Sequence, residues 1–155
     1  MRIKLVSLQT VEKAKSIILD GLKERFSVFD TTYNTDLQDL LMSYNGEDRK
    51  LFIGEKQGEV VCTGALTKRS NHVVGIERVS VDIQWRNQGF AKRMISHLEN
   101  EAHKQSYSKL IVETSDHWHS AIHLYKTCGY HEVQRKHNCI YFEKLLSQRR
   151  KYDEC

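Results

Sequence analysis

The sequence predicts an α/β (α+β) fold whose strands and helices follow one another in the order βααβββαβαββ. Two observations carry this prediction. A strand-like segment over residues 73–82 leads through a polar loop into an amphipathic helix over residues 89–104. A short apolar segment over residues 109–114, which reads as a strand buried on both faces, is followed by a second helical stretch over residues 117–128.

The first third of the chain predicts one strand and two helices. Residues 2–7 alternate as a strand does, and residues 11–26 place an apolar stripe on one face of a helix. Residues 30–34 are polar and rich in turn formers, and residues 36–44 read as a second short helix. Asn45-Gly46 predicts the turn that leaves this helix.

The remaining elements are a hairpin before the central strand and two strands at the end. The hairpin spans residues 51–55 and 59–67 and closes at Gln57-Gly58. In the helix over residues 117–128, Ser115 or Asp116 is the predicted N-cap and Gly129 the C-terminal stop. The last two strands are predicted over residues 130–135 and 139–145.

Length and composition predict one domain over residues 1–146 and a charged tail over residues 147–155. The chain is 39% hydrophobic and 28% charged, and no apolar run is long enough to span a bilayer. The N-terminus alternates like a strand and does not read as a signal peptide, so a cytoplasmic location is expected. The net charge of +4 is mild and scattered, which argues against nucleic acid and membrane as partners. The cysteines show no paired spacing and are expected to be reduced thiols.

The loop between the central strand and the long helix predicts a phosphate site. Backbone N–H groups and the positive end of a helix dipole converge where a strand passes through a glycine loop into a helix. A glycine there lets a diphosphate approach the backbone. The loop sequence is Arg86-Asn87-Gln88-Gly89-Phe90-Ala91. On spacing alone, a glycine at the start of a helix is more often just a strand–helix turn.

The flanking segments favour the phosphate-binding interpretation. Residues 77–85 precede the loop, and residues 121–130, Ala-Ile-His-Leu-Tyr-Lys-Thr-Cys-Gly-Tyr, follow it. Together they resemble the GNAT superfamily of acetyl-CoA-dependent N-acetyltransferases, over about residues 50–145. That family reads Val-x-x-x-x-Arg/Gln-x-x-Gly-x-Gly/Ala and later Leu-Tyr-x-x-x-Gly-Phe/Tyr. The resemblance implies a mixed, mostly antiparallel sheet of about seven strands flanked by about four helices, with central strands that part to admit the cofactor.

The resemblance also implies where acetyl-CoA binds. The backbone of Val79, Ser80 and Val81 pairs with the pantetheine arm, and the loop from Arg86 to Lys92 holds the diphosphate. Trp118 departs from the family, which often has an asparagine there that contacts the pantetheine. A tryptophan cannot make that amide contact, so Trp118 is expected to pack against the pantetheine or to close the sheet edge.

Tyr125 and Glu77 are the predicted catalytic residues. At the position of Tyr125 the family has a tyrosine that protonates the leaving thiolate, whereas spacing alone favours a core aromatic. Glu77 precedes Val79 and Val81 by two and four residues, so it is expected to share their strand face. The family often uses a glutamate on this strand to take the amine proton, commonly through water. An ion pair with a neighbouring lysine or arginine is the alternative for Glu77.

The acceptor site is the least determined part. In the family it is built from the first two helices, their connecting loop and the turn between the last two strands. The residues implicated here are Phe26, Asp30, Tyr33, Asn34, Asp36 and residues 135–138. Acidic and aromatic side chains suit a cationic amine, but a solvated loop has the same composition.

A metal site is not predicted. His119 and His123 have a helical spacing that can chelate zinc, but no third ligand stands at a recognisable spacing. The predicted function is therefore transfer of an acetyl group from acetyl-CoA to a primary amine of a small molecule, by direct attack in a ternary complex. The alternatives are acetylation of a protein N-terminus or lysine, and a non-catalytic acyl-CoA sensor. The basic cluster Arg149-Arg150-Lys151 leaves a homodimer open.

Overall fold

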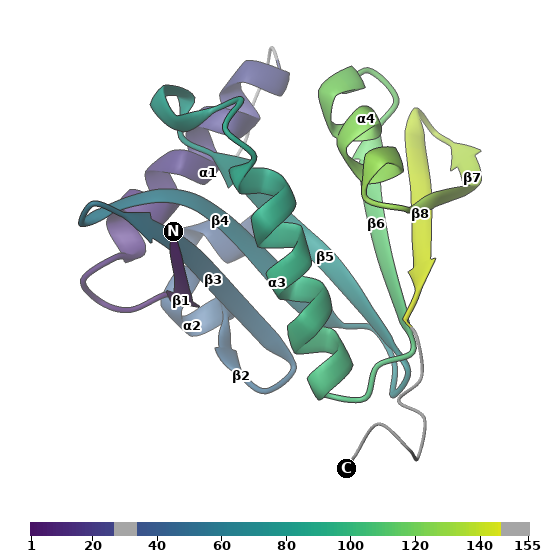
Figure 1. Cartoon of the computed structure of the whole chain (residues 1–155), viewed down its shortest axis with the longest axis horizontal. Coiled ribbons are helices and arrows are strands. Elements are labelled where there is room, and N and C mark those ends of the chain that lie inside the picture. Colours follow the sequence, from purple (N-terminus) through teal and green to yellow (C-terminus); the bar gives the residue numbers. More distant parts are fainter. Residues whose placement is uncertain (27–33, 147–155) are drawn as a thin grey trace.

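One mixed sheet organises the chain in the computed structural model, which describes residues 1–26 and 34–146 (Figure 1). The predicted tail and the acceptor residues Asp30 and Tyr33 lie outside these described residues. In chain order the strands are β1 Arg2–Leu5, β2 Asn45–Gly46, β3 Arg49–Lys56, β4 Glu59–Lys68, β5 Val73–Val81, β6 Lys109–Ser115, β7 His131–Lys136 and β8 Cys139–Leu145. The helices are α1 Val11–Arg25, α2 Leu40–Ser43, α3 Phe90–Lys104 and α4 His119–Thr127, with 3-10 turns η2 Thr35–Gln38 and η3 Ile83–Trp85.

The sheet divides into two halves that meet at its single parallel pairing among the described strands. The strand order is β1-β3-β4-β5-β6-β8-β7, and β2 pairs with β3 at one edge. Every pairing is antiparallel except β5 with β6. That pairing extends over three residue pairs, from Val73 opposite Lys109 to Gly75 opposite Ile111. Beyond Gly75 the two strands part, and Figure 1 shows β6, β8 and α4 standing away from β5.

Helices cover both faces of the sheet, and each face has its own core. The stripe predicted for the long helix is buried in α3 except for Ala91, which is only partly buried; the buried members are Phe90, Met94, Ile95, Leu98 and Ala102. It forms one cluster with the inner side chains of α4 and β8, including Tyr125 and Phe142. On the opposite face, α1 and α2 pack around Ile18, Leu22, Leu40 and Leu51. The mixed sheet with its covering helices confirms the predicted fold class.

Three predicted elements are corrected by the structure. The helix expected over residues 36–44 is divided into η2 and α2 because Asp39 is extended, and its side chain accepts a hydrogen bond from the Met42 N–H at 3.1 Å. Asn45-Gly46 is not the turn after this helix; it is strand β2, paired with Arg49 and Lys50. This strand brings the sheet to eight strands, one more than expected.

The third correction concerns β6, which is buried on one face only. Leu110, Val112 and Thr114 are buried, whereas Glu113 is exposed. On the other face, the described core cluster under α1 and α2 contains no residue of β6. In the described part of the chain, no helix combines the length and apolar composition needed to cross a bilayer.

Candidate functional site

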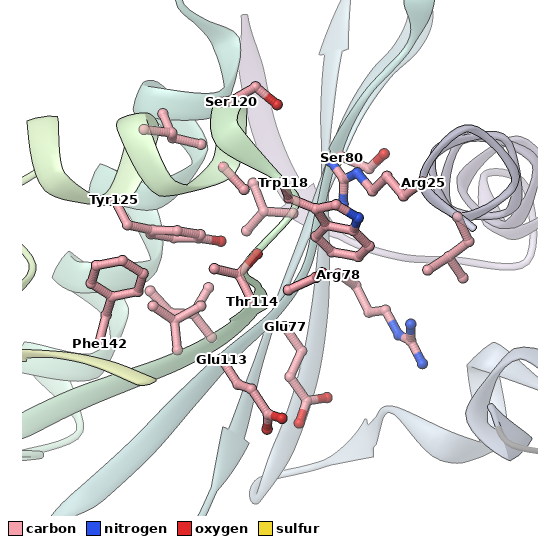
Figure 2. A pocket seen from close by; sticks show the side chains of 18 of the residues that line it. Arg25, Glu77, Arg78, Ser80, Glu113, Thr114, Trp118, Ser120, Tyr125 and Phe142 are labelled. Atoms are coloured by element: carbon pink, nitrogen blue, oxygen red, sulfur yellow. The ribbon is translucent and has the colours of Figure 1, made fainter. Parts of the chain in front are cut away.

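A cleft of about 1700 Å³ lies where β5 and β6 part. Its walls come from α1, β5, the loop into α3, β6, α4 and the turn between β7 and β8. Figure 2 shows the centre of this cleft, with Glu77 and Arg78 from β5, Thr114 from β6, and Trp118 and Tyr125 from the start and the body of α4. The cleft therefore joins segments that are distant in sequence.

A β-bulge in β5 determines which side chains face the two sides of the sheet. Thr63 pairs with Ser80 and Ala65 pairs with Glu77, so Arg78 and Val79 together lie opposite Gly64 alone. Arg78 has a φ of +55°, an uncommon conformation for a residue with a side chain. The extra residue reverses the alternation of side chains along the strand.

The bulge overturns one prediction about Glu77. Glu77 pairs with Ala65 and Val81 pairs with Cys62; the two partners are three residues apart on β4 and so point to opposite faces. Glu77 therefore does not share a face with Val81, and it faces the side covered by α1 and α2. Simple alternation failed because the sequence gives no sign of the bulge.

The backbone of Val79 to Val81 lies along the open edge of β5. All three residues line the cleft, and β6 pairs with β5 only as far as Gly75. The Ser80 hydroxyl donates to the Ile17 carbonyl of α1 at 3.3 Å, so its side chain is directed away from the cleft into the opposite core. An extended ligand can add to such a strand edge through main-chain hydrogen bonds.

The loop into α3 has the backbone conformation of an anion site. Gly89 is the N-cap of α3 with a φ of +83°, and Asn87 also has a positive φ of +62°. A Cβ added at Gly89 would have nothing within 4 Å, so the backbone there is open. The first turn of α3 contains no acidic residue. The unpaired N–H groups of a helix start and its dipole favour an anion at this point.

The predicted loop residues differ in how they meet the cleft. Six of the seven line it: Arg86, Asn87, Gly89, Phe90, Ala91 and Lys92. Gln88 is not among the lining residues. The Arg86 guanidinium is paired with the Glu24 carboxylate at 2.8 and 3.1 Å, and its Nε donates to the Val81 carbonyl at 3.0 Å. This arginine thus ties the loop to α1 and β5.

Tyr125 is held rigidly on α4. Its side chain is 6% exposed, and its ring packs edge-on against Tyr130 at 5.6 Å between centroids. α4 ends at Thr127 with Cys128 as its C-cap; Gly129, the predicted stop, follows with a φ of +89°, and the Tyr130 N–H donates to the Tyr125 carbonyl at 3.0 Å. In Figure 2 the Tyr125 hydroxyl faces the cleft. Burial raises the pKa of Tyr125, so the phenol remains protonated.

Trp118 connects the two halves of the molecule across the cleft. Its ring meets Phe26 at 5.2 Å between centroids, and the Arg25 guanidinium lies 4.4 Å from its ring centroid. Trp118 is itself the N-cap of α4, which begins at His119, two residues later than predicted. Ser115 does not cap the helix; its hydroxyl accepts from the His117 N–H at 3.2 Å.

Glu77 lies in a network of charged groups at one end of the cleft. Its Oε1 is 2.7 Å from Nη2 of Arg69, the ion pair considered as the alternative to a base role. The Tyr44 hydroxyl lies 3.4 Å from the other Glu77 oxygen and donates to Asp36 at 2.7 Å. Because Glu77 also lines the cleft, the ion pair and a role in proton transfer are both compatible with its position.

Asp36 and Arg78 form a bidentate ion pair within this network. Nη2 and Nε of Arg78 donate to the two Asp36 oxygens at 2.7 and 3.0 Å, and Nη2 also donates to Asn34 at 3.0 Å. Burial opposes the ionisation of Asp36, but hydrogen bonds from Arg78 and Tyr44 outweigh it, so the pKa of Asp36 lies below its ordinary value. This pair fixes η2 to the bulge of β5.

The acceptor residues predicted from the sequence are brought together in part. Phe26, Asn34 and Asp36 line the cleft, as do His137 and Asn138 from the turn between β7 and β8. Asp30 and Tyr33 lie outside the described residues, so their prediction stands untested. Sequence reasoning missed several lining residues: Arg25, Arg49, Arg69, Arg78, Glu113 and Thr114. A signal existed only for Thr114, a polar residue in the apolar row of Leu110 and Val112.

The helix-borne histidines lie beside the cleft without forming a metal centre. Within residues 1–26 and 34–146, no three histidine, cysteine or acidic side chains are grouped to hold a metal ion. His123 lines the cleft, and His119 does not.

Comparison with known proteins identifies the family. The model of the acetyltransferase (GNAT) family matches residues 17–130. Human N-acetyltransferase 8B is 33% identical over 108 residues, which cover 65% of this chain and 47% of the relative. Human N-acetyltransferase 8 is 30% identical over 119 residues, which cover 72% of this chain and 52% of the relative. The chain thus spans about half the length of the curated relatives it matches.

Solved structures share the fold at lower identity. A GNAT family acetyltransferase from Staphylococcus aureus has a TM-score of 0.84 at 19% identity, covering 94% of this chain and 99% of its own. An aminoglycoside 6'-N-acetyltransferase complexed with coenzyme A has a TM-score of 0.78 at 13% identity, covering 97% of this chain and 100% of its own.

Proposed function

Because the chain belongs to the GNAT acetyltransferase family, we propose that it transfers an acetyl group from acetyl-CoA to a primary amine of a small molecule. The amine attacks directly while both substrates are bound. The observation that carries this proposal is the parted pair β5 and β6, which opens a cleft leading from the start of α3 to Tyr125.

The residues of the cleft fit a long, flexible ligand with an anionic end. The open backbone at Gly89 and the start of α3 suit the diphosphate. The free edge of β5 at Val79 to Val81 suits the amide-bearing pantetheine arm. Trp118 stands where this arm would pass, and its contacts with Arg25 and Phe26 hold the wall in place.

Tyr125 and Glu77 would carry the proton transfers. Bound acetyl-CoA supplies an acetyl group activated as a thioester. The Tyr125 phenol, kept neutral by burial, would give its proton to the departing thiolate. The Glu77 carboxylate would take a proton from the amine, directly or through water, on the side of the sheet that faces α1 and α2. Its Oε1 lies 2.7 Å from Nη2 of Arg69, and this ion pair holds the carboxylate at its position on the cleft.

The acceptor end of the cleft carries both signs of charge. Both carboxylate oxygens of Asp36 accept hydrogen bonds from Arg78, and one of them also accepts from Tyr44. Glu77 is therefore the carboxylate of this network that would receive the amine proton. Charged side chains of both signs at this end of the cleft suit a small amine that also carries other polar groups.

A paired substitution tests the cofactor site. Gly89→Glu places a carboxylate where the diphosphate is expected and should abolish the rise in melting temperature that coenzyme A produces. Gly58→Glu is the matched control, because Gly58 also has a positive φ and open surroundings but does not line the cleft. Equal stabilisation of both variants by coenzyme A would overturn the assignment of the phosphate loop.

Release of free thiol from acetyl-CoA against a panel of amines tests the reaction itself. We expect release with one class of small primary amines. Release only with peptides would favour the protein-directed alternative. Tight binding of acetyl-CoA without release for any acceptor would indicate a non-catalytic sensor.

A further inference from the structure

One buried hydroxyl on the wall of the cleft has no hydrogen-bond partner. Thr114 is 4% exposed, and its Oγ1 is buried without a partner among the described residues. It lies on β6 opposite Ile140 of β8, in the row that continues Leu110 and Val112. Thr114 lines the cleft, and in Figure 2 its side chain faces the same space as the Tyr125 hydroxyl and the Trp118 ring.

Packing does not explain a threonine at this position. Its neighbours in the row are aliphatic, and valine has the same shape without the hydroxyl. A buried hydroxyl that makes no hydrogen bond destabilises the folded state, so native proteins rarely keep one without a use. No described protein group pairs with the hydroxyl, so a polar group that enters the cleft beside Thr114 would supply the missing partner.

The surrounding residues indicate what that group is. The start of α3 suits the phosphates, and Thr114 lines the cleft on the same side as Tyr125 (Figure 2), the proposed proton donor to the thiolate, so the part of the ligand beside Thr114 is the arm that joins the phosphates to the thioester. The ring of Trp118, four residues later on the same wall, packs against Phe26 and Arg25. A hydroxyl both donates and accepts, which matches an amide.

We propose that Thr114 is a cofactor-binding residue whose hydroxyl hydrogen-bonds to an amide of the pantetheine arm of acyl-CoA. This inference rests on the proposed function, and it assigns to β6 a contact that Trp118 cannot make. The free enzyme holds Thr114 in an unfavourable state, and binding relieves it.

The test compares Thr114→Val with a matched control, Thr67→Val. Thr67 on β4 also has a buried Oγ1 without a partner among the described residues, but it does not line the cleft. Without ligand, each valine variant should melt at the same temperature as the wild type or a few degrees higher, because an unpaired buried hydroxyl is removed. Thr114→Val should bind coenzyme A about three- to tenfold more weakly, the scale of one neutral hydrogen bond. Thr67→Val should bind it as the wild type does.

Two further arms locate the contact. Adenosine 3′,5′-bisphosphate lacks the pantetheine arm, so Thr114→Val should bind it with unchanged affinity. Thr114→Ser keeps the hydroxyl and should bind coenzyme A within about twofold of the wild type. Calorimetric titration measures all of these affinities.

The outcomes separate the inference from the proposed function. A lower melting temperature of ligand-free Thr114→Val with unchanged coenzyme A affinity would overturn the inference, because the hydroxyl would then be structural. Equal weakening of coenzyme A and the bisphosphate would overturn it as well, since the change would not be confined to the arm. A wild type that binds neither ligand would contradict the proposed function itself.

Discussion

Tyr125 combines burial with access to the cleft. Its ring is packed against Tyr130 and Phe142, and burial raises its pKa above the ordinary value of about 10. A raised pKa keeps the hydroxyl protonated throughout the neutral and mildly alkaline range. A residue in this state can donate a proton but does not serve as a base.

We therefore expect Tyr125→Phe to bind coenzyme A almost as the wild type does and to lower kcat about ten- to a thousandfold. In the wild type, kcat should not decline on the alkaline side below about pH 9.5, because Tyr125 does not lose its proton there. Steady-state kinetics from pH 6 to 9.5 measure both effects. A Tyr125→Phe variant with unaltered kcat would remove the proposed proton donor.

We expect His97 to make the stability of the fold dependent on pH. It lies on α3 with its ring 4.8 Å from that of Phe52, and its Nε2 is buried without a partner among the described residues. Burial lowers the pKa of His97 below its ordinary value of about 6.5. The unfolded chain therefore binds a proton at a higher pH than the folded chain, so this contribution to stability is present above about pH 6.5 and is lost as the pH falls towards the folded-state pKa.

We expect the melting temperature of the wild type to fall more steeply between pH 7 and pH 5 than that of His97→Leu, which has no group to protonate. His97→Gln, with a neutral polar side chain, should resemble His97→Leu. Calorimetry of the three proteins without ligand gives the comparison. If the three slopes agree, protonation of His97 does not contribute to acid unfolding.

At the scale of elements, α4 shows how a helix end can position a side chain. Gly129 adopts a positive φ, and the Tyr130 N–H reaches back to the Tyr125 carbonyl in the last turn. Gly129→Ala should destabilise the protein by about 1 kcal/mol, and so should Gly58→Ala in the hairpin of β3 and β4, since both glycines have positive φ. Only Gly129→Ala should also lower kcat, because it disturbs the turn that holds Tyr125. Thermal melting and kinetics of both variants decide this, and equal kcat values would show that the helix end does not position Tyr125.

The elements also show what sequence patterns could and could not predict. The stripe of α3 and the glycines at 89 and 129 follow local rules of periodicity and capping, and they were predicted correctly. The bulge at Arg78 depends on how β5 pairs with β4, and no local pattern reports such a register shift. The same holds for the break at Asp39, where a side-chain cap replaces a helix that periodicity favoured.

The residues of the candidate site also divide into those that local sequence patterns predict and those that only the folded sheet brings together. Tyr125 and most of the loop from Arg86 to Lys92 line the cleft, and each belongs to a motif that can be read within one short segment. The arginines at 49, 69 and 78 come to the same wall from three separate segments, so their meeting depends on the folded sheet. Patterns within a segment thus found cleft-lining residues of the proposed cofactor site more completely than those of the proposed acceptor site.

On the scale of the whole molecule, the two halves of the sheet have little direct connection. β5 and β6 share three residue pairs, and across the cleft Trp118 meets Arg25 and Phe26. A ligand that lies along β5 and touches β6 and α4 would join the halves and raise the melting temperature with its concentration.

The single domain over residues 1–146, the cytoplasmic location and a homodimer stay predictions from the sequence.

The two tryptophans of the chain offer a direct view of this joining. Trp85 lines the cleft beside the phosphate loop, with its ring 6.1 Å from that of Phe90, whereas Trp118 lines it near the centre. Coenzyme A should change the fluorescence of both, because it extends along the whole cleft. Adenosine 3′,5′-bisphosphate should change only that of Trp85. The variants Trp85→Phe and Trp118→Phe assign the two signals: Trp85→Phe should keep a response to coenzyme A and lose the response to the bisphosphate. If the bisphosphate changed the fluorescence of Trp118 and not that of Trp85, coenzyme A would bind in the opposite direction, with its phosphates towards Glu77 and away from α3.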